Sequence, residues 1–316
     1  MSVPLWAWSV TVVGVGLLLA GELVVHRVAK PSGLRRAAVE SALWIVVSLL
    51  FGVLLGVVEG FAVAGQYFSG YLLEKSLSVD NVLAFALIFR SLAVPLELQR
   101  GVLEWGVVGA LVLRGAYIAG GSAFIGHVSW AFYVFGAIVL VAGIRMGRGG
   151  AGAHPRRSLV LRTLRRVLPV STEFSGRRFF TSSRGRLTAT PLLVALVAIE
   201  ATDVLFATDS IPAIFGVTTN VFVVFTSNAF AVLGLRSLYF VLATAMGRFV
   251  YLTKGLAALL VLIGVKMLLQ SIVRVPTAIN LAAILVVLSA SVGLSLAHER
   301  RGRGDVSIGG HVPRSH

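Results

Sequence analysis

Nine apolar segments, each of about 20 residues, limit most strongly how this chain can fold. Hydrophobic residues make up 57% of its 316 residues and charged residues only 13%, a balance that soluble globular domains do not show. About 20 apolar residues in a helix can cross the hydrocarbon core of a bilayer. The sequence therefore predicts an all-α, polytopic membrane protein with about nine transmembrane helices. The expected spans are 5–25, 38–60, 68–91, 102–123, 129–146, 188–215, 219–245, 253–272 and 276–297.

The basic residues predict how the spans are oriented. Lys and Arg gather in alternate loops and in the C-terminal tail, while the loops between these hold a single basic residue, Arg274. Because cytoplasmic loops carry the excess of Lys and Arg, we expect a multi-pass protein of the cytoplasmic membrane with its N-terminus outside and its C-terminus in the cytoplasm. The Arg-rich segment 147–187 then lies on the cytoplasmic side. We expect a solvated, partly disordered linker there, with contact to anionic lipid or to a regulator as the alternative.

Composition also excludes several classes of function. The formal net charge is +15, but no basic fold module is present, and the basic residues are distributed as membrane loops require, so we expect no nucleic-acid partner. The chain has no cysteine, which excludes disulfides, thiolate catalysis and soft metal sites. All six histidines fall in loops, at span ends or in the tail, so we expect no imidazole ligand in the bilayer core.

Acidic residues inside the apolar segments are the strongest functional signal. The chain has only 13 Asp and Glu residues, and ionisable groups in hydrocarbon are costly enough to persist mainly where they line a polar site or pathway. Two pairs share a spacing of six residues: Glu74 with Asp80, and Asp203 with Asp209. A duplicated pair predicts a site built twice. The six acids in or at the edge of predicted spans are Glu59, Glu74, Asp80, Glu200, Asp203 and Asp209.

Other motifs extend this duplication into a repeat. The sequence VLRGAYI at 112–118 resembles GLRSLYF at 234–240, and GIRMG at 143–147 resembles GVKML at 264–268. Spans three to five thus match spans six to eight, and an odd number of helices per repeat requires the second copy to run inverted across the membrane. The predicted organisation is two N-terminal helices (1–67), a first three-helix repeat (68–146), the cytoplasmic linker (147–187), a second repeat (188–272), and a last helix with the tail (273–316).

The acid pairs predict a cation site at the repeat interface. Carboxylate, amide and hydroxyl oxygens suit Mn²⁺, Ca²⁺ or Mg²⁺. We expect Asp80 and Asp209 to meet near the midplane, with Glu74 and Asp203 as flanking positions toward opposite sides. Pro212 predicts local unwinding of the helix beside Asp209. The full set of candidate metal ligands is Asp80, Asp209, Glu74, Asp203, Asn81, Ser210, Asn228 and Glu200.

Each of these residues also has a structural interpretation. The acid pairs could form buried salt bridges, and Asn228 could make only an interhelical hydrogen bond. Arg114 and Arg236, at equivalent repeat positions, are either counter-charges to the acids when the cation is absent or members of purely structural ion pairs. Arg145 and Lys266 lie near span ends, where long basic side chains extend toward water.

Three segments, EKSLSVDN, LFATDSIPAIFGVT and FTSNAFAVLGLRSLYF, resemble the signature segments of the TerC family of integral membrane proteins. The resemblance runs from about residue 40 to 272 and is closest to the Alx-like branch. It implies a relation to the LysE-type transporter superfamily and a role in manganese efflux, with tellurite resistance as a historical label. The family acids required for manganese export correspond to Glu74, Asp80 and Asp209.

The sequence thus predicts a transporter that exports divalent cations, preferably Mn²⁺, with proton competition for the carboxylates as a means of coupling. The metal is substrate, and no tightly bound cofactor is expected. Besides the metal and the lipid bilayer, no partner is predicted. Enzymatic activity is not expected: an intramembrane aspartyl protease would need a GxGD context around its paired acids, which the acids here lack, and no GxxxxGK[ST] loop for ATP occurs. The alternative is a non-transporting membrane component of a metal or tellurite stress-resistance complex.

Overall fold

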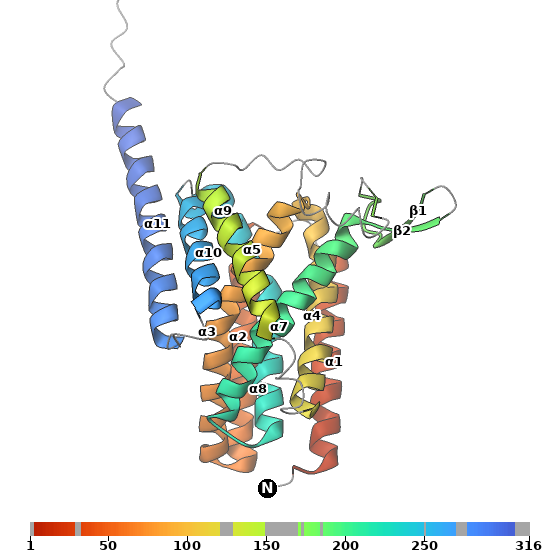
Figure 1. The fold of residues 1–316 in the computed structure, drawn as a ribbon. Coiled ribbons are helices and arrows are strands. Elements are labelled where there is room, and N and C mark those ends of the chain that lie inside the picture. Colours follow the sequence, from red (N-terminus) through yellow and green to blue (C-terminus); the bar gives the residue numbers. More distant parts are fainter. Residues whose placement is uncertain are drawn as a thin grey trace, which may run out of the picture.

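The structure is a computed structural model of the chain. It describes residues 3–28, 33–120, 129–148, 170–171, 174–183, 186–249, 251–269 and 277–306. Most of these residues are helical, and Figure 1 shows the helices side by side in one bundle. The helices are α1 (Leu5–Val28), α2 (Leu34–Glu59), α3 (Phe61–Ser91), α4 (Leu96–Gly120), α5 (Ser129–Gly147), α7 (Pro191–Phe215), α8 (Val221–Leu233), α9 (Leu235–Arg248), α10 (Leu252–Leu269) and α11 (Thr277–Val306).

The structure confirms the predicted all-α membrane fold in its helical content and in its apolar helices. Each predicted span is helical over most of its length. Within the described residues, six helical segments are long and apolar enough to cross a membrane: α1, α2, α4, α7, α8 with α9, and α10. Charged residues interrupt the apolar sequence of α3. The number of nine spans and the proposed domain boundaries stay predictions.

Helices at equivalent repeat positions pack against each other in antiparallel pairs. In α3 and α7, Asn81 contacts Asp203, while Gly70 lies against Ile214. In α5 and α10, Gly143 lies against the backbone of Ala257 and Val261. The other end of that pair brings Gly264 against Leu140 and Gly136 against Met267. In each case the residue number rises along one helix as it falls along its partner.

Two helix interruptions differ from those that the sequence predicts. Pro212 does not unwind α7, which is continuous from Pro191 to Phe215. Pro212 removes only one backbone bond near the end of the helix, and the buried side chains of Ile211 and Ile214 hold this part of α7 in the core. The predicted span 219–245 corresponds to one apolar helical segment, Val221–Met246, with an unpredicted one-residue interruption at Gly234 between α8 and α9.

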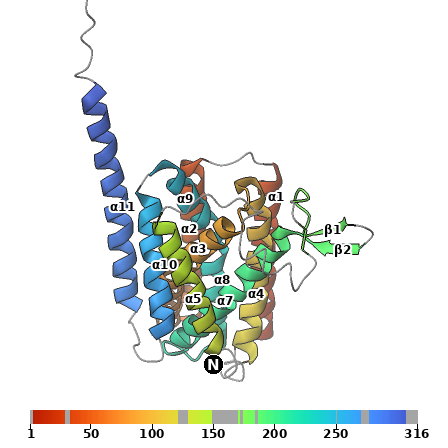
Figure 2. The ribbon, with the colours of Figure 1, turned by 45° about the horizontal axis from the view of Figure 1, so that its top comes forward.

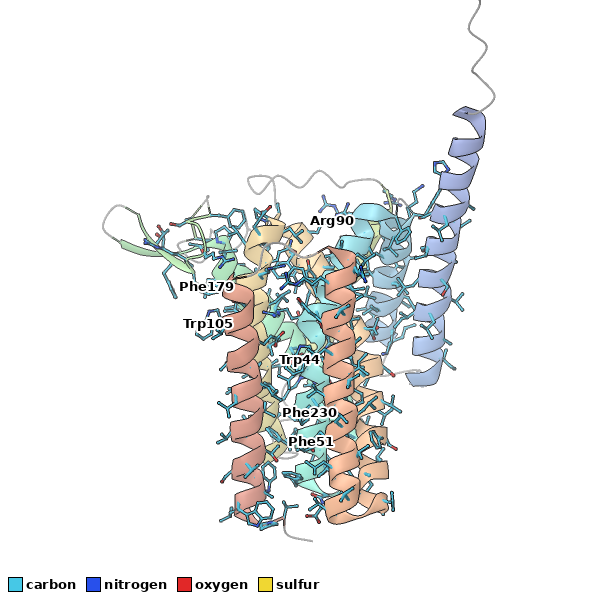
Figure 3. The ribbon with its side chains drawn as sticks, turned by 180° about the vertical axis from the view of Figure 1, so that it is seen from behind. Trp44, Phe51, Arg90, Trp105, Phe179 and Phe230 are labelled. Carbon is cyan, nitrogen blue, oxygen red and sulfur yellow. The ribbon has the colours of Figure 1, made fainter. Side chains whose placement is uncertain are left out.

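An aromatic cluster joins the two N-terminal helices to the repeats. Phe51 of α2 stacks on Phe230 of α8 with ring centroids 4.4 Å apart, and Tyr67 of α3 packs against both rings. Figure 3 shows Trp44, Phe51 and Phe230 along the same side of the bundle. Buried aromatic contacts of this kind hold α2 against α3 and α8. At the opposite edge, α11 packs on α10 (Figure 1).

The segment before α7 is more ordered than the predicted linker. Strands β1 (Phe180–Ser183) and β2 (Arg186–Ala189) form an antiparallel hairpin in which Phe180 pairs with Ala189. The hairpin projects sideways from the helices (Figures 1 and 2). Most of the predicted linker, residues 149–169, lies outside the described part of the chain. The prediction of a partly disordered linker therefore stays untested for most of its length, while the hairpin at its end is ordered by backbone pairing.

Candidate functional site

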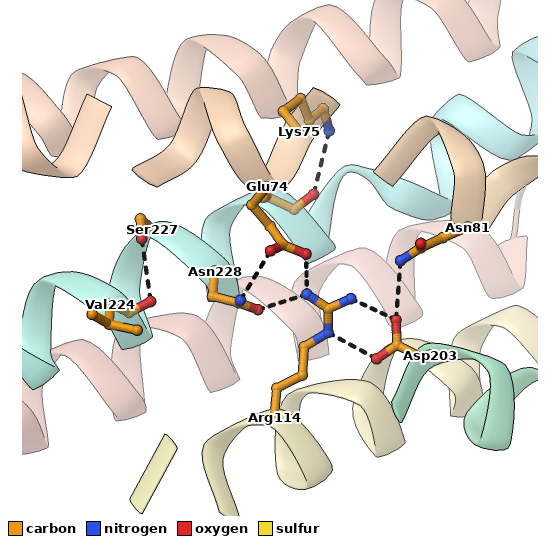
Figure 4. Close-up of polar contacts among 9 residues, drawn as sticks. Glu74, Lys75, Asn81, Arg114, Asp203, Val224, Ser227 and Asn228 are labelled. Atoms are coloured by element: carbon orange, nitrogen blue, oxygen red, sulfur yellow. Dashed lines mark hydrogen bonds and ion pairs between the residues drawn. The ribbon is translucent and has the colours of Figure 1, made fainter. Parts of the chain in front are cut away.

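The guanidinium group of Arg114 joins an acid of α3 to an acid of α7. Arg114 lies in α4 and donates two hydrogen bonds to Asp203 of α7, from Nε to Oδ2 over 2.8 Å and from Nη2 to Oδ1 over 2.7 Å. Its Nη1 also donates to Oε1 of Glu74 in α3 (Figure 4). All three side chains are buried. Such a pair of carboxylates could not remain buried and ionised without a counter-charge, and Arg114 supplies it.

Two asparagines complete this network. Asn228 of α8 accepts a hydrogen bond from Arg114 Nη1 over 2.9 Å and donates from Nδ2 to Oε2 of Glu74 over 3.2 Å. Asn81 of α3 donates from Nδ2 to Oδ1 of Asp203 over 3.3 Å (Figure 4). Asn228 therefore does make the interhelical hydrogen bonds of its structural interpretation. We call Arg114, Glu74, Asp203, Asn81 and Asn228 the central cluster.

Asp80 is buried on the same helix as Glu74 but meets a different basic residue. Its Oδ2 lies 3.8 Å from Nζ of Lys266 in α10. Lys266 thus contacts a site acid, whereas its place near a span end predicts only extension toward water. The predicted meeting of Asp80 with Asp209 stays untested, because the side chain of Asp209 lies outside the part of the structure that is described.

The remaining predicted ligands lie along α7. Ser210 is buried, and its hydroxyl makes no hydrogen bond to any described residue. The carboxylate of Glu200 occupies the space that Gly109 of α4 leaves open, because a side chain at Gly109 would clash with it. Oε2 of Glu200 is likewise buried without a hydrogen bond to the described residues. Glu200 therefore lies at the α4–α7 contact, one helical turn before Asp203.

The arrangement changes the expected roles of the acids. Glu74 and Asp203 were expected to flank the centre toward opposite sides, but the structure brings both onto Arg114. α3 and α7 run antiparallel, with Asn81 beside Asp203, and the long side chain of Arg114 reaches from Asp203 to Glu74. Arg114 contacts two of the acids, as both the counter-charge interpretation and the structural ion-pair interpretation require. Arg236 does not, since it binds Glu22 of α1 over 2.8 Å and Glu104 of α4 over 3.3 Å.

Lys75 is a site residue that the sequence interpretation missed. It follows Glu74 directly and donates from Nζ to the carbonyl oxygen of Ala231 over 3.3 Å (Figure 4). That carbonyl lies in the last turn of α8, where backbone acceptors lose their helical partners. The lack of a side chain at Gly234 leaves room, since a Cβ there would be 2.9 Å from Lys75 Nζ. In the sequence, only its position next to Glu74 in EKSLSVDN could have drawn attention to Lys75.

The central cluster consists of carboxylate and amide groups arranged around the guanidinium group of Arg114. Within the described residues, no three His, Asp or Glu side chains are grouped to hold a metal ion. The lead helices α3 and α7 nevertheless present buried oxygens without hydrogen bonds to the described residues: Ser78 Oγ, Asn81 Oδ1 and Ser210 Oγ. Asp203 also borders a cavity of about 10 Å³ that Arg236 and Gly106 line, enough for roughly one water molecule.

Comparison with known proteins places the chain in a family. The model of the integral membrane protein TerC family matches residues 59–303. An uncharacterised membrane protein of Myxococcus xanthus is 42% identical over 297 residues, which cover 94% of this chain and 93% of the relative. An Escherichia coli protein named "Putative membrane-bound redox modulator Alx" is 42% identical over 292 residues, 88% of this chain and 90% of the relative.

A more distant relative and the structural comparison complete the findings. An uncharacterised membrane protein of Mycobacterium tuberculosis is 40% identical over 272 residues, 84% of this chain and 68% of the relative. No solved structure matches the chain. Because the family model covers most of the chain and the relatives align over nearly its full length, the chain belongs to the TerC family of integral membrane proteins.

Proposed function

We propose that the chain exports divalent metal cations from the cytoplasm, with Mn²⁺ as the preferred substrate. The observation that carries the proposal is the meeting of Glu74 and Asp203, one acid from each predicted repeat, on the buried guanidinium of Arg114. A divalent cation that displaces Arg114 would find two carboxylates, with the amide oxygens of Asn81 and Asn228 close by. Carboxylate and amide oxygens of this kind are ligands for hard divalent cations.

The same packing supports two inverted three-helix repeats. α3 pairs with α7 and α5 with α10, each in antiparallel directions, as an inversion across the membrane requires. In transporters built this way the site lies at the repeat interface, and one repeat moves against the other to change access. We further propose nine spans in the cytoplasmic membrane, with the N-terminus outside, and a relation to the LysE-type transporter superfamily.

Arg114 would stabilise the site after the cation has left. With cation bound, its positive charge is redundant; with cation released, it neutralises Glu74 and Asp203. Protons compete with metal for the same carboxylates, so an inward proton gradient would favour outward release. No tightly bound cofactor and no enzymatic step is part of the proposal.

Metal flux in proteoliposomes tests the proposal. We expect purified wild-type protein to carry Mn²⁺ faster than Ca²⁺, Mg²⁺ or Zn²⁺, and the single variants Asp80→Asn and Asp209→Asn to lose transport while still inserting in the bilayer. Exposed Glu59 and Glu97 provide matched controls, since Glu59→Gln and Glu97→Gln remove the same charge away from the site and should transport normally. Glu74→Gln and Asp203→Asn remove the two carboxylates that meet on Arg114, and wild-type flux in both of these variants would show that the proposed site is wrong.

A second candidate is a non-transporting membrane component of a metal or tellurite stress-resistance complex. The name of the Alx relatives, which refers to redox modulation, favours it. Since this chain has no cysteine, such a role would not use thiol–disulfide exchange by the chain itself. This candidate predicts that cells carrying Asp80→Asn keep their metal or tellurite resistance, whereas the transporter predicts that they lose it.

A further inference from the structure

An exposed group of two arginines and a phenylalanine lies just before α7. Arg177, Arg178 and Phe180 are all exposed, and Phe180 retains 50% of its accessible surface. We call these three residues the basic lip. The segment 174–189 around it contains four arginines and no acidic residue. The basic lip therefore combines positive charge with an uncovered aromatic ring.

The basic lip is anchored at one end to the start of α7. Oγ1 of Thr190 donates to the carbonyl oxygens of Arg178 and Phe179 over 2.8 and 3.0 Å, and the Thr190 amide donates to the same Phe179 oxygen over 2.9 Å. Phe179 packs against the main hydrophobic core. The turn that presents Arg177 and Arg178 begins at Gly176, whose φ of 56° favours glycine. The hydrogen bonds of Thr190 and the packing of Phe179 thus keep the basic lip on the outside of the protein.

The position of the basic lip fits a membrane surface. Trp105 of α4 is 59% exposed, and Figure 3 shows it on the same side of the molecule as Phe179, which adjoins the basic lip. Exposed Trp side chains on membrane helices mark the interface between hydrocarbon and headgroups. The hairpin projects sideways past the helices, so the bilayer around the protein is the body that it faces (Figures 1 and 2).

We propose that the basic lip docks on anionic lipid headgroups, with Arg177 and Arg178 on lipid phosphates and Phe180 inserted among the headgroups. Anionic leaflets attract basic segments near their surface, and an aromatic ring gains from leaving water at this depth. Because Thr190 ties the basic lip to the first turn of α7, the lipid contact would hold the start of the helix that carries Asp203. The proposal does not depend on the transported ion.

Spin labelling tests the proposal in the full chain. The sequence has no cysteine, so Ser175→Cys introduces a single attachment point next to the basic lip. The labelled protein is placed in nanodiscs of phosphatidylcholine with increasing phosphatidylglycerol, and the label's depth is read from its accessibility to oxygen and to a water-soluble nickel chelate. We expect the label to move to headgroup depth as phosphatidylglycerol rises, and the double variant Arg177→Gln/Arg178→Gln to need roughly tenfold more anionic lipid.

Two comparisons make the result decisive. The double variant Arg35→Gln/Arg36→Gln removes the same charge from the exposed start of α2, and it should leave the label's depth unchanged. High salt should weaken the contact, because it screens exposed charges. Equal depth with and without phosphatidylglycerol, or no effect of Arg177→Gln/Arg178→Gln, would overturn the proposal. If inorganic phosphate at constant ionic strength moves the label away from headgroup depth, the proposal is also overturned. That outcome would indicate that the basic lip binds free anions and not a lipid surface.

Discussion

Arg114 of α4 binds Asp203 of α7 through two parallel hydrogen bonds, from Nε over 2.8 Å and from Nη2 over 2.7 Å. This fork geometry is specific to arginine, because lysine offers a single charged nitrogen. The pair is buried, and Glu74 shares the same guanidinium. The single positive charge of Arg114 thus compensates one acid from each predicted repeat.

Removing Arg114 should therefore destabilise the protein strongly. Arg114→Gln leaves Glu74 and Asp203 buried without their counter-charge, and we expect a loss of about 3–5 kcal/mol in the free energy of unfolding. Thermal unfolding in detergent measures it. Adding Asp203→Asn to Arg114→Gln should restore part of the loss, because one uncompensated charge disappears. A double variant less stable than Arg114→Gln alone would contradict this account of the cluster.

The sequence was sufficient to predict the helices and the buried acids. Apolar length alone indicates spans, and a charge within one is costly enough to predict a site. It did not predict which acids meet. Glu74 and Asp80 are separated by about 9 Å along a helix, and which of them is linked to Asp203 depends on where Arg114 of α4 packs between α3 and α7.

The helix break was also beyond the reach of local sequence rules. Pro212 is the stronger breaker by itself, yet α7 continues through it, while the chain breaks at Gly234. At Gly234 the Lys75 amine and Trp44 lie too close for a side chain, at 2.9 and 3.2 Å from a Cβ there, which accounts for the glycine. Close packing alone does not end a helix, since Gly264 is packed at least as closely inside the continuous α10.

The contact between α5 and α10 should not tolerate a side chain at Gly264. A Cβ on Gly264 would lie 2.6 Å from the backbone nitrogen of Leu140, and a backbone cannot move aside as a flexible side chain can. We expect Gly264→Ala to lower the free energy of unfolding by about 1–3 kcal/mol through overpacking. Thermal unfolding of the purified protein measures the change.

Gly14 provides the matched control for this prediction. It lies within α1, and nothing is within 4 Å of a Cβ there. Gly14→Ala should be neutral or stabilise the helix by about 0.5–1 kcal/mol. The prediction fails if Gly264→Ala is as stable as Gly14→Ala.

Arg236 and Glu22 should be energetically coupled, because their ion pair joins the N-terminal helix α1 to α9 in a buried setting. Their distance is 2.8 Å, and the side chains are 5% and 8% exposed. A double-mutant cycle with Arg236→Gln and Glu22→Gln should give a coupling energy of about 1–3 kcal/mol. The exposed pair of Arg36 and Glu40, at 3.2 Å in α2, should give only about 0.3–0.5 kcal/mol. Equal coupling energies in the two cycles would contradict the idea that the Arg236–Glu22 ion pair stabilises the packing of α1 against α9.

Binding of Mn²⁺ should stabilise the protein if the proposed site exists. A ligand present at 100 times its dissociation constant adds about 2.7 kcal/mol to the free energy of unfolding. We expect a rise in melting temperature with Mn²⁺ that becomes smaller as the pH falls, because protons compete with metal for the carboxylates. Asp80→Asn should lose the rise, while the exposed control Glu97→Gln should keep it.

Arg114→Lys tests whether the cation displaces residue 114. The lysine retains a counter-charge but cannot make the two parallel hydrogen bonds to Asp203. Mn²⁺ should therefore displace it more easily and stabilise the variant at lower concentrations than wild type. An unchanged Mn²⁺ dependence in Arg114→Lys would mean that the cation binds without moving Arg114.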